Sequence, residues 1–580
     1  MKKHNILLVS FVIGGLAISC SEDLLDVSNN NQMTTQDFGN DETTLQEAVI
    51  ACYNHTRMEG TYGRVGYNYD VCRGDEAWNS SQVWYLPYDD LNSEVTNEMN
   101  CWVYRDWFYT LNVCNYVLYK IPEAGVSTSY DRMRGQALFL RGLAYYNLMG
   151  YYQDVPLITN YEDYSTLDGL YCSISKQSEI IEQIKADLSE AITLLPKRDE
   201  GGEWAKGRAT QGSAAGLLAK TLMFNHEYSE ALKYLEGIIN GQYGTYSLMS
   251  NYGANFQEGT EYENNAESLY EVQFLDYGSQ GTDDEWTPVN TSANATQGHA
   301  IESNYAAGSY GGWADISGST WLYNLFKAEK TKDGKLDPRL YWTLCTYETD
   351  WTDSYPEGGY GNVYYTNPVT ATSNIKTNNN QGGIPIVKNT NARTGVLSSV
   401  VTGLKCGINL RLIRLADIYL LAAEASNEVN GPTQKAIDYI NKVRQRANLN
   451  DLSLSDFSTA DALFEQIANV ERPKELGCEF GRGFDLIRWG WFYNDGRLAQ
   501  LKQHGAEKFN AKTEELYTDY PVVNPSKTSY DNYRQGHEYI PYYQGTLNDN
   551  PNLGEGNSAN TSTANTPDFT VHPVVDGIGL

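Results

Sequence analysis

Apolar residues recur at intervals of three and four along much of this chain, which is the period of one face of an α-helix. Residues 410–447 carry two such stripes: Leu412, Leu415, Ala416, Tyr419, Leu420 and Ala423, and then Ala436, Ile437, Ile440, Val443 and Ala447. Between them, Asn430-Gly431 favours a helix end, and Pro432 suits the first turn of a new helix. The pattern predicts two antiparallel helices, whose stripes must pack against other parts of the chain.

The helical period returns elsewhere. It is found in residues 41–60, 101–121, 131–150, 178–195 and 461–490, and twice in residues 210–240, around a polar turn at Asn225–Ser229. The pairs in 210–240 and 410–447 are similar to tetratricopeptide units, which are helical hairpins with small residues where helices cross. We therefore predict a mainly α fold, a tetratricopeptide-like scaffold of helical hairpins from which long irregular aromatic-rich loops extend.

Residues 61–100 and 241–400 make up these irregular parts, because a helical period is found there only briefly, near Thr320–Glu329. So long a stretch without a period is uncommon in a compact domain unless it is functional. The chain has 45 Tyr, 12 Trp and only 15 Phe. Since Tyr combines a ring for stacking with a hydroxyl for hydrogen bonding, this bias favours an aromatic surface in contact with water.

Two irregular stretches place aromatic rings beside amides and carboxylates. A protein that binds a sugar needs ring faces for the C–H side of a pyranose and polar groups for its hydroxyls. The candidate ligand-binding residues are Asp75, Trp78, Asn79, Trp84 and Tyr85 in the first stretch, and Trp286, Tyr310, Trp313 and Trp321 in the second. At each position the alternative is a ring that packs beneath its own loop.

Charge and motifs exclude other classes of function. The formal net charge of −30 argues against nucleic-acid binding, which needs basic patches. The seven His form no H-E-x-x-H, and the sequence has no G-x-S-x-G and no Walker loop, so it favours a binding protein over an enzyme. Asp283-Asp284-Glu285 is the best candidate for a glycosidase carboxylate pair. It is also an example of an oxygen-rich loop that could hold a structural Ca²⁺, although the sequence has no D-x-D-x-D-G loop. No other cofactor is indicated.

The N-terminus predicts an export signal. Lys2 and Lys3 precede an apolar run, 6–18, that is too short to span a bilayer. The run ends at Ser19-Cys20 and resembles a bacterial lipoprotein cleavage box, which would make Cys20 a lipidated N-terminus. The next residues, Ser21-Glu22-Asp23, resemble a surface-export signal. The other eight Cys form no C-x-x-C and predict buried free thiols, although a Cys101–Cys114 or Cys52–Cys72 bridge stays open.

Five motifs, in order along the chain, resemble the SusD/RagB family. They lie at residues 131–158, 207–222, 410–449, 471–490 and 540–553. The first is similar to the family pattern A-x-x-x-R-A-x-x-Y-x-x-L-x-x-x-Y-G-D-V-P-L, with Gln153 in place of Gly. The resemblance implies a non-enzymatic, surface-exposed lipoprotein of the outer membrane that lies on a SusC-like TonB-dependent transporter. Such proteins capture glycans, or in some branches peptides.

These observations divide the chain into predicted segments. They are a signal peptide (1–19), a lipidated tether (20–40), an N-terminal SusD-like helical region (41–240), a loop-rich ligand-binding region (241–400), a C-terminal helical region (401–553) and a polar tail (554–580). We interpret the motif Glu471, Arg472, Arg482, Asp485, Arg488 and Trp489 as a buried ion network that fixes the fold. Peptide capture, a scaffold for a protein partner and a glycosidase remain the alternatives.

Overall fold

The structure is a computed structural model that describes residues 39–79, 82–124, 127–166, 169, 171–275, 298–306, 312–313, 315–345, 384–391, 406–506, 528–554 and 571–575. The helices and strands of its first half are α1 (Glu42–His55), α2 (Val65–Arg73), β1 (Ala77–Asn79), α3 (Leu86–Asp89), α4 (Met99–Ala124), α5 (Thr128–Tyr152), α7 (Gln177–Leu194), α8 (Arg198–Gly201), α9 (Gln211–Phe224), α10 (Tyr228–Ile239) and β2 (Ser268–Val272). The second half adds α11 (Ile301–Tyr305), β3 (Ile316–Gly318), α12 (Thr320–Lys327), α13 (Pro338–Thr343), β4 (Ile384–Pro385), β5 (Leu410–Arg414), α17 (Leu415–Asn430), α18 (Gln434–Arg446), α19 (Ala460–Gln466), α20 (Arg472–Leu476), α21 (Arg482–Arg488), α22 (Asp495–Ala506) and α24 (Gln544–Asp549).

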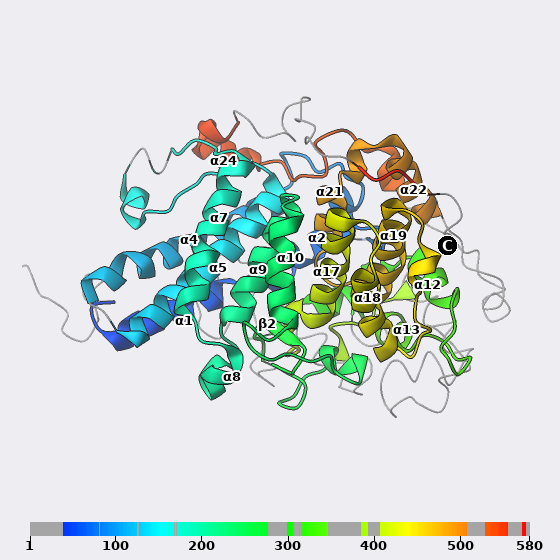
Figure 1. The fold of residues 1–580 in the computed structure, drawn as a ribbon. Coiled ribbons are helices and arrows are strands. Elements are labelled where there is room, and N and C mark those ends of the chain that lie inside the picture. The colour runs from blue at the N-terminus through cyan, green and yellow to red at the C-terminus, as the bar shows by residue number, and fades with distance from the viewer. Residues whose placement is uncertain are drawn as a thin grey trace, which may run out of the picture.

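The long helices form one continuous row (Figure 1). Each packs on the next in the order α1, α4, α5, α7, α9, α10, α17 and α18, from blue on the left of the view to yellow on the right. The apolar stripes of neighbours meet in a single core, in which α5 is buried along most of its length. This arrangement confirms the predicted mainly α, tetratricopeptide-like scaffold.

Short polar residues set the helix ends. The hydroxyls of Ser127, Thr210 and Thr433 cap α5, α9 and α18 by accepting a hydrogen bond from a backbone N–H in the first turn. Gly431 ends α17 with φ +70°, as its place after Asn430 predicts. Pro432, however, precedes the Thr433 cap, so its predicted place inside the first turn of α18 is wrong.

The prediction that Leu412 begins a helical stripe is also wrong. Residues Leu410–Arg414 form strand β5, which pairs antiparallel with β2. An ion pair joins the same two strands, since Arg411 Nε lies 3.1 Å from Glu271 Oε1. The helix begins only at Leu415. The backbone of Leu410–Arg414 forms its hydrogen bonds with β2, a segment about 140 residues earlier in the chain, and so does not join the helix.

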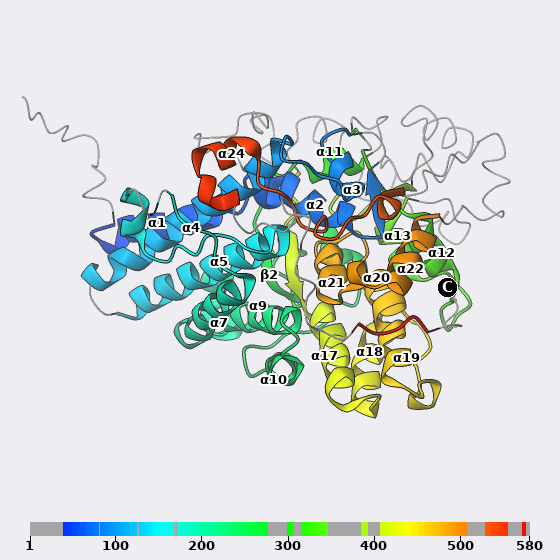
Figure 2. The ribbon, with the colours of Figure 1, turned by 90° about the horizontal axis from the view of Figure 1, so that it is seen from above.

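A small three-stranded sheet joins parts of the chain that the sequence analysis treated as separate loops. Its order is β1-β3-β4, with antiparallel pairing throughout. Helices α2 and α3 pack beside β1, and α11 packs on β3. Figure 2 shows these helices together at one edge of the molecule, beside the helical row.

Three further features bear on the predictions. The helix α10 begins at Tyr228, so the polar turn is shorter than the predicted Asn225–Ser229. All eight Cys after Cys20 are free thiols and most are buried, as predicted, and neither suggested bridge forms. Among the described helices, none is both long enough and apolar enough to serve as a membrane span.

Candidate functional site

The structure brings the two predicted aromatic stretches together. In the β1–β3 ladder, Trp78 lies opposite Ser317 and Asn79 opposite Ile316. A chain of buried side-chain hydrogen bonds links the same stretches. Asn68 Nδ2 lies 3.4 Å from Tyr85 Oη and 2.9 Å from Asn304 Oδ1, and Asn304 Nδ2 lies 3.0 Å from Asp315 Oδ2. The residues around Trp84 and Trp313 therefore rest on one rigid polar support.

Two of the predicted rings, Trp84 and Trp313, are partly exposed. The Arg64 guanidinium carbon lies 5.8 Å from the Trp313 ring centroid, a cation–π contact that helps to hold the indole in place. Beside Trp84, Val83 and Leu86 are 67% and 43% exposed. An exposed apolar surface of this kind is typical of a binding site. We call Trp84, Trp313, Val83 and Leu86 the aromatic surface.

Three other predicted residues lie beneath this surface. The side chain of Trp78 is 7% exposed and that of Tyr85 is 1% exposed. Tyr85 packs edge-on against Tyr69, with ring centroids 6.0 Å apart, and its burial raises its pKa. Asn79 closes a turn, because it donates to the carbonyl of Gln82 and accepts from its N–H. These residues support the surface and offer little of their own area to a ligand.

Asp75 and Trp321 are in the core, which differs from the loop surface expected for them. The two Asp75 carboxylate oxygens lie 2.7 and 2.9 Å from Arg482 Nε and Nη2, and Oδ2 also lies 2.8 Å from His504 Nδ1. Burial acts to raise the pKa of Asp75, but the Arg482 charge and these hydrogen bonds outweigh it and lower the pKa. Trp321 stacks on His504 with ring centroids 4.0 Å apart. Both side chains stabilise the fold at this junction.

The remaining predicted residues, Trp286, Tyr310 and Cys20, lie outside the described residues, as does the Asp283–Glu285 loop suggested for Ca²⁺ or for catalysis. Their roles stay predictions. Within the described part of the chain, no group of three or more His, Cys, Asp or Glu side chains is arranged to hold a metal ion.

The charged side chains of the motif in residues 471–490 form the buried ion network that the sequence predicted. Arg472 Nη2 lies 2.6 Å from Asp485 Oδ2, and Arg444 Nη1 lies 2.6 Å from Glu471 Oε1. Arg488 Nη2 and Trp489 Nε1 donate to Glu424 at 2.7 and 2.8 Å. Because these charged side chains have buried partners of opposite charge, the motif stabilises the fold, as predicted.

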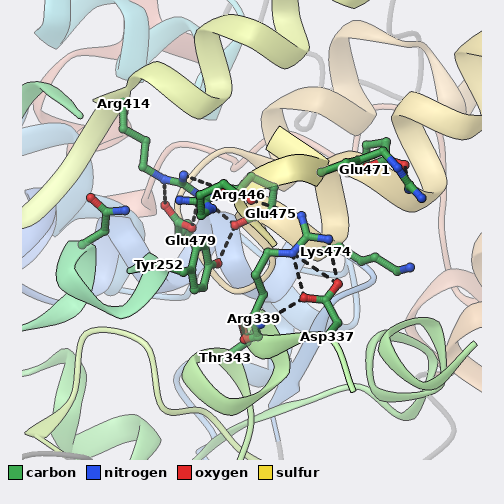
Figure 3. Close-up of polar contacts among 12 residues, drawn as sticks. Tyr252, Asp337, Arg339, Thr343, Arg414, Arg446, Glu471, Lys474, Glu475 and Glu479 are labelled. Carbon is green, nitrogen blue, oxygen red and sulfur yellow. Dashed lines mark hydrogen bonds and ion pairs between the residues drawn. The ribbon is translucent and has the colours of Figure 1, made fainter. Parts of the chain in front are cut away.

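Glu475 is the centre of a second buried cluster (Figure 3). It pairs with Arg446, with Arg414 at 2.5 Å and with Arg339 at 3.1 Å, and all four side chains are buried. The neighbouring Glu479 pairs with Arg414 at 2.8 Å. Burial acts to raise the pKa of Glu475, but the charges of the three guanidinium groups outweigh burial. The pKa of Glu475 is therefore lowered below its ordinary value. These pairs tie α20 to β5, α13 and α18, so they hold the helical row against the loop-bearing part of the fold.

Glu76, next to Asp75, gives a pH-dependent prediction. Burial raises the pKa of Glu76 from its ordinary value of 4.5 to about 8, and Arg482 offsets only part of this effect. Between those pH values the folded protein holds a proton that the unfolded chain has released, so this group lowers stability as pH rises. For Glu76→Gln, we expect the gain in unfolding free energy over wild type to be larger at pH 8 than at pH 5, by on the order of 4 kcal/mol. Urea unfolding at both pH values measures it; a difference independent of pH contradicts this assignment.

Sequence reasoning missed Val83, Leu86 and the polar support from Asn68 and Asn304. Val83 and Leu86 flank Trp84 in the run Val83-Trp84-Tyr85-Leu86, and an apolar run outside any helical period is the signal that points to them. No sequence signal joins Asn68 to Asn304, because they come together only when β1 pairs with β3.

Together, a row of helical hairpins and a partly exposed aromatic surface define a helical-repeat protein with a candidate ligand-binding surface. Residues 266–558 match the model of the SusD family. Residues 23–223 match a related model, described as starch-binding and associating with the outer membrane. The chain belongs to the SusD family.

Individual relatives extend over nearly the whole chain. The SusD-like protein P2 of Formosa agariphila is 23% identical over 499 residues, which cover 84% of this chain and 91% of that protein. A SusD superfamily protein from Bacteroides vulgatus superposes with a TM-score of 0.69 at 25% identity, covering 89% of this chain and 98% of that one. Surface glycan-binding protein A from Bacteroides fluxus has a TM-score of 0.64 at 19% identity, covering 91% and 99%.

Proposed function

We propose that this protein is a lipid-anchored outer-membrane protein of the cell surface that captures an oligosaccharide or polysaccharide. It then delivers the glycan to a SusC-like TonB-dependent transporter and does not cleave it. Membership of the SusD family supports this proposal, and so do relatives such as the glycan-binding protein of Bacteroides fluxus. The observation that carries it is the aromatic surface, in which Trp84 and Trp313 are partly exposed on segments joined by buried hydrogen bonds.

The chemistry of this surface suits binding without reaction. An indole face can contact the C–H side of a pyranose. Because the support beneath the ring is rigid, less side-chain entropy is lost when a ligand binds. Two carboxylates on the described segments around Trp313 have protein partners. Glu59 pairs with Arg64 at 2.7 Å, and Asp315 accepts from Asn304. These carboxylates position other residues, and neither is placed as a free acid or base beside a bound sugar.

The anchor and the transporter partner follow from the resemblance of the sequence to surface lipoproteins of the family. Lipidation of Cys20 would keep the protein at the membrane, and residues 21–40 would serve as its tether. A ligand held outside the membrane by the aromatic surface would then lie close to a membrane-embedded transporter.

Affinity electrophoresis in gels that contain single polysaccharides tests this function. We expect wild type to be retarded by at least one polysaccharide. Trp84→Ala and Trp313→Ala should each weaken that binding about tenfold, since a stacked ring contributes on the order of 1.4 kcal/mol. The double variant should lose most of the retardation.

Tyr171→Ala is the matched control, because Tyr171 is an aromatic residue that is 50% exposed and lies outside the aromatic surface. It should bind as wild type does. Unchanged retardation of the double variant would show that the glycan binds elsewhere, and binding of peptides with no retardation by any polysaccharide would favour peptide capture.

A further inference from the structure

A polar cavity lies apart from the aromatic surface and shares no residue with it. Its volume is about 270 Å³. It is formed by α8 and the turn after it, the segment around Tyr246, and strand β2. The charged and aromatic residues that line it are Arg198, Asp199, Glu203, Lys206, Arg208, Tyr246, Tyr270 and Glu271.

Hydrogen bonds to the backbone fix the walls of this cavity. Arg198 Nη2 donates to the carbonyl of Asn264 at 2.8 Å, and its guanidinium lies over the Tyr246 ring at 5.5 Å. Both carboxylate oxygens of Glu271 accept from the Asn264 N–H, at 2.9 and 3.0 Å. Asp199 accepts from the N–H and the hydroxyl of Thr245, at 3.3 and 3.1 Å. A cavity with walls held in this way needs little rearrangement to accept a ligand.

Arg208 supplies donors that the fold does not use. Its guanidinium carbon lies 5.3 Å from the centroid of the Trp204 ring, which orients the side chain. Among the described residues, only the carbonyl of Trp204 accepts from this guanidinium, from Nη1 at 3.4 Å. The side chain is half-buried, so its other N–H groups keep the capacity to bind a polar ligand.

The charges of the lining favour an uncharged ligand. The lining carries three cations, Arg198, Lys206 and Arg208, and three carboxylates, Asp199, Glu203 and Glu271. Arg411, which pairs with Glu271 at 3.1 Å, adds one positive charge, so the cavity has little excess charge to attract an ion. Guanidinium donors, carboxylate acceptors and a Tyr ring together match a molecule with hydroxyls at its rim and C–H groups on its face. The volume is close to the lower limit of about 300 Å³ for small-molecule sites, which suits one or two sugar rings.

We propose that this cavity is a second carbohydrate subsite, which takes a mono- or disaccharide unit independently of the aromatic surface. The proposal rests on the glycan-binding function above and gives that function a second point of contact. Two separate subsites on one protein raise the avidity for a polymer that reaches both, or let the protein hold two chains at once.

The test uses saturation-transfer NMR titrations of the full-length protein with maltose, laminaribiose, cellobiose and mannobiose. We expect Trp84→Ala/Trp313→Ala to keep its affinity for at least one of these disaccharides. In that background, Arg208→Ala should weaken the disaccharide about tenfold, and Thr245→Trp should abolish its binding by filling the cavity mouth. Lys197→Ala is the matched control, because Lys197 is a cation next to α8 that does not line the cavity, and it should change nothing. Thermal unfolding confirms that each variant is folded.

The outcomes separate this inference from the proposed function. Polysaccharide retardation that depends on Trp84, together with disaccharide binding unaffected by both cavity variants, overturns the subsite and leaves the function intact. Loss of all disaccharide binding in the Trp84→Ala/Trp313→Ala variant also overturns the subsite and leaves the proposed function intact. Disaccharide binding that depends on Arg208 supports the subsite even if Trp84 proves unimportant. Saturable binding of inorganic phosphate that needs Arg208, without disaccharide binding, overturns the assignment to sugars.

Discussion

Replacement of Glu475 by alanine is expected to destabilise the protein by about 3–5 kcal/mol, a large fraction of the about 5–15 kcal/mol that stabilises a typical folded protein. The carboxylate pairs with Arg339, Arg414 and Arg446, and all of these side chains are buried. Its loss leaves three guanidinium groups competing for the remaining Asp337, Glu267 and Glu479 carboxylates. A buried charge with too few partners cannot recover its hydration, and this penalty exceeds the value of the pairs themselves. The midpoint of guanidinium-induced unfolding measures the effect.

An exposed ion pair provides the control for Glu475. Glu236 lies 2.6 Å from Lys435, and both side chains are in contact with solvent. Since exposed pairs contribute about 0–1 kcal/mol, Glu236→Ala should change stability only slightly. If Glu475→Ala and Glu236→Ala had similar unfolding midpoints, the buried cluster would not be what holds α20 against the rest of the fold.

Gly150→Ala is expected to destabilise the protein by about 3 kcal/mol or more. Gly150 lies in α5, where an added Cβ would be 1.8 Å from Cε1 of Phe484 in α21. The Phe484 ring cannot move away easily, because it stacks on Tyr146 at 5.4 Å and meets Tyr151 edge-on at 5.5 Å. The substitution therefore forces apart the contact between the N-terminal helices and the C-terminal motif. Thermal unfolding measures the loss.

The same substitution at another glycine of α5 serves as the control. At Gly142, an added Cβ would meet only the flexible end of Leu188, at 3.1 Å. Alanine also favours the helix by about 1 kcal/mol over glycine, so Gly142→Ala should be nearly neutral or slightly stabilising. Phe484→Leu should recover part of the loss caused by Gly150→Ala, and a double variant with no such coupling would contradict the steric explanation.

Local patterns predicted the helices well and the location of individual side chains poorly. The stripes in residues 131–150 and 210–240 became α5, α9 and α10, because a helix forms its hydrogen bonds within one segment. Strand β5 was missed because its partner, β2, lies far away in the sequence. Most of its residues also suit a helix, and nothing local records the pairing.

The aromatic candidates show the same limit. Trp84 and Trp321 were both candidate sugar-binding rings, yet one is partly exposed and the other is buried against His504. Asp75 likewise meets Arg482, more than 400 residues away in the chain. The chemistry of these residues could be predicted, but the contacts that bury Asp75 and Trp321 exist only once the chain has folded.

The structure of the protein bound to an oligosaccharide from the polysaccharide that retards it most tests the central claim directly. The account predicts a sugar ring stacked on Trp84 or Trp313, and an oligosaccharide that is bound whole, with none of its glycosidic bonds cleaved. A ligand that leaves both rings uncovered, or one found only in fragments cut by the protein, would contradict it.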